Sequence, residues 1–354
     1  MWSKLTKHEG QIKSQKIPGH NTQKKQLSAS TVSIIALCLL LFLMFFSVTQ
    51  GVSNISLRKV IDAFFHFKPE NSQHLIIVDL RLPRVLASAF VGAAFAVAGA
   101  IMQGTTRNPM ADSGLLGLNA GAGLALAIGF AFFPNLTYLQ KLISAFVGAG
   151  MGVMLVNSIS SVKEGENKPM KLVLAGAAVS ALLTALSQGL ALYTNVSQSL
   201  MFWTVGGVAA INWQQLFILL PWIIGGILLS LLLSKSISML SLGEDLALSL
   251  GVNVERVHRW SMFTVLILAG AAVSVVGAVG FVGLIIPHIA RFLIGVDYRK
   301  VIPVSAVLGA LLMTAADLGA RMVNPPVETP IGALISLIGV PFFLYLASKQ
   351  RRDF

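Results

Sequence analysis

Ten apolar stretches restrict the possible folds of this chain more than any other feature of its sequence. Each is bounded by Gly, Pro, Asn or a cluster of charges, and only 11% of the residues are charged, against about 25% in soluble proteins. Because about 20 apolar residues in a helix cross a membrane, we predict an all-α polytopic membrane protein with about ten transmembrane helices. The stretches cover residues 32–50, 84–103, 115–134, 140–161, 171–193, 214–234, 258–281, 283–296, 301–322 and 331–348.

Two apolar segments are too short to cross a membrane as straight helices. Residues 283–296 also contain Pro287, and residues 199–210 are expected to form a half-helix at one surface. Around the spans, the charge pattern predicts a basic cytoplasmic tail over 1–31, a transmembrane domain over 32–348 and a second cytoplasmic tail over 349–354.

The distribution of Lys and Arg predicts which side of the membrane each segment faces. With the N-terminus in the cytoplasm and spans of alternating direction, 19 of the 26 basic residues fall in cytoplasmic segments. Cytoplasmic loops carry the excess of Lys and Arg in membrane proteins, so we expect both termini in the cytoplasm. The formal net charge of +12 then indicates contact with anionic lipid and no role in nucleic-acid binding.

An internal repeat indicates a transporter. GAAFAVAGA at residues 92–100 returns as GAAVSVVGA at residues 270–278, five spans later, so the two copies should run in opposite directions. Inverted repeats are frequent in membrane transporters, and we predict one here, with halves at about 84–193 and 258–348. The same offset of 178 residues also relates Pro109 to Pro287 and Gly117 to Gly295.

The sequence offers no chemistry of its own. It has no His-x-x-x-His or Cys-x-x-Cys spacing for a metal, and the single cysteine, Cys38, cannot form an internal disulfide. It also has no paired catalytic groups within the spans and no G-x-x-x-x-G-K-[ST] motif for ATP. We therefore expect neither an enzyme nor a bound cofactor or metal, and energy must come from a partner.

Four motifs together resemble those of the FecCD-type permeases, the membrane subunits of ABC importers for iron–siderophores, haem and vitamin B12. The chain departs from the family pattern at Met110 and Ser113, where Leu and Pro are commoner. The resemblance begins near residue 30 and implies a permease domain in the bacterial plasma membrane. Its motifs are LRLPRVLASAFVGAAFAVAGAIMQGTTRNPMADSGLLGLNAGA (80–122), GEDLALSLGV (243–252), GFVGLIIPHIAR (280–291) and ADLGARMVNPPVETPIGALISLIGVPFFLYL (316–346).

The resemblance implies transport of a ferric siderophore that a lipid-anchored or periplasmic binding protein delivers. It also implies a second permease subunit, identical or related, and two cytoplasmic ATPase subunits that use ATP. Haem or vitamin B12 is the alternative cargo. An ion-coupled secondary transporter is a further alternative, but it would need an acid within the membrane. Asp317 is the candidate, and Arg321, one helical turn later, is expected to neutralise it.

A charged cytoplasmic segment, about 240–257, resembles the coupling segment by which such permeases dock into the ATPase. Glu244 and Ala247 are one helical turn apart, and Gly251 permits a sharp change of direction. A solvated loop is the alternative. The residues assigned to coupling are Glu244, Asp245, Ala247 and Gly251.

Three arginines on the outer side come from opposite halves of the repeat: Arg81, Arg84 and Arg321. Arginine binds carboxylates through paired hydrogen bonds. In the family, arginines at matching positions engage glutamates of the binding protein, so we assign these three to docking. Anchoring at lipid headgroups is the alternative, as is an Arg321–Asp317 pair.

Two groups of residues are candidates for the transport pathway. Asn108-Pro109 and Pro287-His288 are expected to interrupt helices, either to let them tilt or as fixed kinks. Small polar residues recur along one face of the fifth span, where they line the pathway or serve helix packing: Ser180, Thr184 and Ser187. His288 has no accompanying ligand, so we do not expect it to bind a metal.

Overall fold

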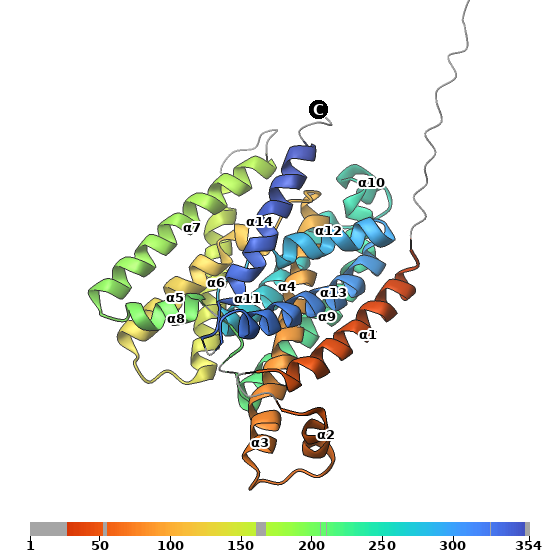
Figure 1. Cartoon of the computed structure of the whole chain (residues 1–354). Helices are drawn as coiled ribbons and strands as arrows, with labels where there is room; N and C mark the ends of the chain where they lie inside the picture. Colours follow the sequence, from red (N-terminus) through yellow and green to blue (C-terminus); the bar gives the residue numbers. More distant parts are fainter. Residues whose placement is uncertain are drawn as a thin grey trace, which may run out of the picture.

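Helices form all of the regular structure in the residues that the computed structural model describes, which confirms the predicted all-α fold (Figure 1). Most of the predicted N-terminal tail and the last four residues of the chain lie outside the described residues. The described residues are 27–51, 55–160, 168–205, 207–209, 211–325 and 327–350.

Each of the ten predicted spans corresponds to one helix. Among the described residues, seven helical segments are long and apolar enough to cross a membrane: Ala29–Thr49 (α1), Ser72–Thr106, which includes Leu82–Thr106 (α4), Tyr138–Ser160 (α6), Leu174–Tyr193 within Lys168–Tyr193 (α7), Trp213–Ser241 (α9), Val254–Val276 (α11) and Tyr298–Met322 (α13). The other three have shorter apolar sections: Leu118–Phe132 (α5), Val282–Ile294 (α12) and Ile331–Gln350 (α14).

Short helices connect the long ones. A π-helical turn, Ile76–Arg81 (η1), leads into α4, and Ser197–Val205 (α8) occupies part of the segment expected to form a half-helix. The remaining short elements are Leu57–Phe65 (α2), Ser72–Leu75 (α3), Ser113–Leu116 (η2) and Glu244–Ser249 (α10). Helices α2 and α3 lie at the lower end of the molecule in Figure 1, whereas α10 and the C-terminal end of α14 lie at the upper end.

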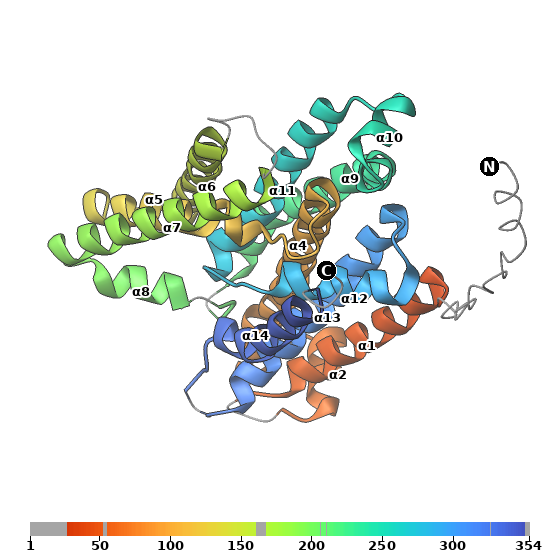
Figure 2. The same cartoon turned by 90° about the horizontal axis from the view of Figure 1, so that it is seen from above.

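Helix α4 is the centre of the fold (Figure 2). The most apolar section of the helix that contains α4 is 89% buried, whereas the most apolar sections of α1 and α9 are each 28% buried. The small residues of the repeated segment permit this burial. A Cβ at Gly92 would overlap the backbone of Gly309 in α13, and one at Gly99 would overlap the backbone of Gly283 in α12. Such close contact between backbones holds helices together in lipid, where the hydrophobic effect contributes little.

The two copies of the repeated segment lie on antiparallel helices. Arg107, at the C-terminal end of α4, pairs with Glu244 (Nη2–Oε1 3.3 Å). Glu244 in turn lies 3.9 Å from His258, near the N-terminal end of α11. Because α4 and α11 pack together, the copies run in opposite directions, in agreement with the predicted inversion. The boundaries of the two halves stay a prediction.

The prediction of matching helix breaks at the two prolines is wrong for the second half. Pro109 lies in the loop that follows α4, but Pro287 and His288 lie inside α12, which continues past them. The interruption comes earlier, between α11 and α12, where Gly277 and Phe281 have positive φ angles of 70° and 68°. Glycine adopts such a conformation at little cost, so the chain turns at Gly277.

Candidate functional site

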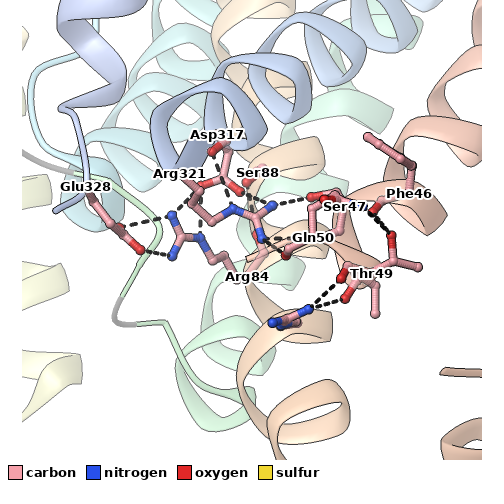
Figure 3. A network of polar contacts seen from close by, with 11 residues as sticks. Phe46, Ser47, Thr49, Gln50, Arg84, Ser88, Asp317, Arg321 and Glu328 are labelled. Atoms are coloured by element: carbon pink, nitrogen blue, oxygen red, sulfur yellow. Dashed lines mark hydrogen bonds and ion pairs between the residues drawn. The ribbon is translucent and has the colours of Figure 1, made fainter. Parts of the chain in front are cut away.

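Charged residues gather at both ends of α4 and form two separate sites. At the N-terminal end they form a largely buried cluster, the arginine network, which consists of Arg81, Arg84, Asp317, Arg321 and Glu328. Figure 3 labels the last four of these residues. At the C-terminal end, Arg107 contacts α10. The 23 residues from Arg84 to Arg107 place the two sites roughly 35 Å apart along the helix, comparable to the thickness of a bilayer.

Arg84 binds two carboxylates at once. Its Nε and Nη2 lie 2.9 and 2.8 Å from Oδ1 of Asp317. Its Nη1 and Nη2 donate to the two carboxylate oxygens of Glu328 at 2.6 and 3.1 Å. Asp317 is fully buried, whereas the side chain of Glu328 is 42% exposed. Arg84 therefore connects α4 to α13 and to the loop that follows α13.

Arg321 neutralises the same aspartate and also holds the end of α1. Its Nη2 lies 3.1 Å from Oδ2 of Asp317, so the expected ion pair is present. Its Nη1 donates to the carbonyls of Ser47 (3.2 Å) and Gln50 (3.1 Å), and its Nη2 donates to the Ser47 hydroxyl. The last carbonyls of a helix have no partner within the helix, and Arg321 supplies one.

Arg81 has the same function beside Arg321. Its Nη1 donates to the carbonyls of Val48 (2.8 Å) and Thr49 (3.0 Å), again in the last turn of α1. The arginine network thus joins the end of α1, the start of α4 and the end of α13, three segments far apart in the sequence.

The structure brings the three arginines assigned to docking together, but it buries them. Their exposed fractions are 7% for Arg81, 8% for Arg84 and 9% for Arg321. A carboxylate from another protein would reach Arg84 only by replacing Glu328, the exposed member of the network. Docking through these arginines stays a prediction.

The loop after α4 turns back into the protein. Arg107 has a positive φ of 53°, and the side chain of Asn108 accepts from the N–H of Met110 at 2.9 Å. Asp112 then faces Gly283, close to the carbonyl of Phe95. Because Phe95 lies in the middle of α4, the Asp112 carboxylate lies deep in the helical bundle.

A hydroxyl group contacts this deep carboxylate. The Ser113 hydroxyl donates to Oδ1 of Asp112 at 3.5 Å. The carboxylate also lies beside Gly283, in the first turn of α12, where a negative charge is favourable. Sequence reasoning did not identify Asp112, because an acid in a polar loop gives no sign that the loop folds inward.

Helix α10 presents an apolar surface outside the bundle. Ala247 is fully buried, whereas Leu246, Leu248 and Leu250 are 47%, 58% and 57% exposed. Gly251 ends the helix with a φ of 78°, which confirms the expected change of direction. Residues 244–249 of the segment assigned to coupling therefore form a short helix with exposed leucines on and beside it, and its role in coupling stays a prediction.

One acidic side chain connects this short helix to the rest of the protein. Glu244, 49% exposed, lies between Arg107 (3.3 Å) and His258 (3.9 Å), while Asp245 is exposed. An exposed ion pair contributes little to stability. The Arg107–Glu244 pair instead fixes the position of α10, because it connects the start of α10 to the end of α4.

The three small polar residues of α7 do not share one environment. Ser180 is half-buried, Thr184 is exposed, and Ser187 is buried against α5 close to Gly123. Ser187 therefore serves helix packing within the chain. A pathway role for Ser180 and Thr184 stays a prediction.

The residues of the two sites contain no recognisable metal centre. Within the described ranges, no group of three or more His, Cys, Asp or Glu side chains could hold a metal ion. Cys38 is exposed on α1.

Comparison with known proteins places these features in a family. A model described as the FecCD transport family matches residues 39–349. The chain is 49% identical to the iron(3+)-hydroxamate import system permease protein FhuB of Bacillus subtilis (strain 168), over 92% of this chain and 84% of that protein. It is 40% identical to the Fe(3+)-citrate import system permease protein YfmD of the same organism, over 94% and 98%.

A solved structure has the same fold. A metal-chelate type ABC transporter in an inward-facing conformation superposes with a TM-score of 0.77 at 28% identity, over 90% of this chain and 99% of that one.

Proposed function

Because the chain belongs to the FecCD transport family, we propose that it is the membrane-spanning subunit of an ABC importer for a ferric siderophore. A hydroxamate-type chelate is the first candidate, since the relative at 49% identity carries iron(3+)-hydroxamate in its name. The observation that supports a transport role most strongly is the pairing of a charged site at each end of one central helix.

The energy for transport comes from partners. Two cytoplasmic ATPase subunits bind the exposed leucines of α10, and the Arg107–Glu244 pair transmits their movement to α4. This assignment puts α10, both termini and Arg107 in the cytoplasm of a bacterial cell. The arginine network then faces the outside, where a lipid-anchored or periplasmic binding protein delivers the chelate. A second permease subunit completes the pore.

A secondary transporter driven by an ion gradient is less well supported. It would need an ionisable acid free to exchange its ion within the membrane. Asp317 pairs with both Arg84 and Arg321. Asp112 is a second deep acid, which the sequence did not reveal, but within the described residues it belongs to no group of three or more Asp, Glu, His or Cys side chains that could hold a metal ion. Haem or vitamin B12 remains the alternative cargo of the same machinery.

Uptake by a reconstituted importer tests the proposal. The chain is placed in proteoliposomes with the ATPase and a ferric-hydroxamate-binding protein, and radioactive iron is counted inside the vesicles. We expect uptake of the ferric hydroxamate that requires both ATP and the binding protein. Uptake driven by an ion gradient without ATP would overturn the ABC assignment, and uptake of haem alone would replace the cargo.

A further inference from the structure

A cavity of about 210 Å³ opens between the ends of α4, α9, α12 and α13, at the same end of the molecule as α10. One water molecule occupies about 30 Å³ of liquid, so the cavity has room for a tetrahedral anion and its hydration. Its polar lining consists of Gln103, Arg107, Ser241, Arg291 and Tyr298, and none of the side chains that line it is acidic.

Arg291 lacks a carboxylate partner. Its Nη1 lies 3.4 Å from the hydroxyl of Tyr298, and its Nη2 is buried without any hydrogen bond. In the part of the chain that the structure describes, no Asp or Glu forms an ion pair with it. A buried guanidinium nitrogen without an acceptor in the protein is costly, so the chemistry around Arg291 favours an anionic ligand.

Two acids on neighbouring segments are already engaged. Glu244 pairs with Arg107, and Asp297 pairs with Arg299 at 3.1 Å. Hydrogen bonds from Arg299 lower the pKa of the Asp297 carboxyl and keep it charged. Asp297 also accepts from Ser238 on α9, at 3.3 Å. These two carboxylates have partners of their own, and Arg291 leaves an uncompensated positive charge at the cavity.

We propose that this cavity binds a phosphate group, and that the phosphate belongs to the headgroup of an anionic lipid. A guanidinium fork matches phosphate oxygens with parallel hydrogen bonds, and Tyr298 and Ser241 add hydroxyl groups. The rim carries Leu242 and Val296, each 62% exposed, which can contact an acyl chain. Basic pockets between the ends of membrane helices have the chemistry that lipid headgroups require.

Thermal unfolding in nanodiscs of defined composition tests the site without any transport assay. The unfolding midpoint of the full-length protein is measured in nanodiscs of phosphatidylglycerol and in nanodiscs of phosphatidylcholine. It is measured separately in detergent, once with inorganic phosphate and once with chloride at equal ionic strength. The variants are Arg291→Gln and, to keep a charge, Arg291→Lys. Arg259→Gln is the matched control, because Arg259 is exposed at the same end and pairs with Glu255.

We expect phosphatidylglycerol to stabilise the unmodified protein and Arg259→Gln equally. For Arg291→Gln we expect the affinity for phosphatidylglycerol to fall about tenfold, which is the effect of losing one charged hydrogen-bonding group. The affinity of Arg291→Lys should lie between that of the unmodified protein and that of Arg291→Gln. Stabilisation by inorganic phosphate alone would support the pocket and make a free anion its ligand. Equal responses of Arg291→Gln and Arg259→Gln to both probes would overturn the proposal.

Discussion

Arg84 and Asp317 are 233 positions apart in the sequence, yet their Nε and Oδ1 atoms lie 2.9 Å apart in the interior of the protein. The pair joins the first half of the chain to the second at one end of α4. Arg321 adds a second positive charge to the same aspartate, and Glu328 adds a second negative charge to Arg84. The four charges compensate one another, which makes the burial of Arg84, Asp317 and Arg321 acceptable.

Removal of the buried carboxylate should destabilise the protein strongly. Asp317→Asn leaves Arg84 and Arg321 close together with Glu328 as their one remaining charged partner in the network. Breaking a buried pair costs about 3–5 kcal/mol, so we expect a clearly lower unfolding midpoint in detergent, measured by tryptophan fluorescence. Asp62→Asn is the control, because Asp62 is 50% exposed and pairs with histidines alone. Equal midpoints would contradict the central role of Asp317.

Glu328 should compete with a docking protein for Arg84. Glu328→Gln removes a charge from a side chain that is 42% exposed, so stability should change by less than about 1 kcal/mol. If a carboxylate of the binding protein takes its place, affinity measured by surface plasmon resonance should rise. Glu70→Gln, an exposed residue between α2 and α3, is the matched control. Weaker binding in Glu328→Gln would mean that the arginines are structural and that docking occurs elsewhere.

Close packing of α4 should depend on single glycines. An added methyl group at Gly99 would overlap the backbone of Gly283, whereas one at Gly225 meets nothing within 4 Å. We expect Gly99→Ala to lower the unfolding midpoint, at a cost of about 1–3 kcal/mol typical of overpacking. Gly225→Ala should leave it unchanged or raise it slightly, since Ala favours the helix. The same midpoint for both variants would show that α4 and α12 can separate without penalty.

Charge reversal on α10 should uncouple the ATPase. Glu244→Lys places a second positive charge beside Arg107, and the change from attraction to repulsion should lower ATP-driven uptake about tenfold. Glu255→Lys introduces the same charge change at a side chain that is 83% exposed on α11, and it should leave uptake unchanged. Co-purification of the ATPase with each variant distinguishes lost binding from lost transmission. Normal uptake by Glu244→Lys would show that α10 does not couple the ATPase to transport.

The sequence by itself determined the helical class of the fold and the positions of its ten apolar helices. An apolar stretch of membrane length forms an α-helix in lipid, because every backbone N–H and C=O group must be hydrogen-bonded within the segment. For the same reason the short stretch at 283–296 was recognisable as a helix of reduced length, and the structure has α12 there with 13 residues.

The tertiary structure alone decided which charges meet. Sequence placed Arg81, Arg84 and Arg321 at one surface, but only the folded chain buries them against the last turn of α1 and brings Glu328 to Arg84. It also moved the second interruption from Pro287 to Gly277, because a proline within a helix forfeits one hydrogen bond while a positive φ reverses the chain. Periodicity fixes each helix locally, whereas partners more than two hundred residues apart depend on how the helices pack.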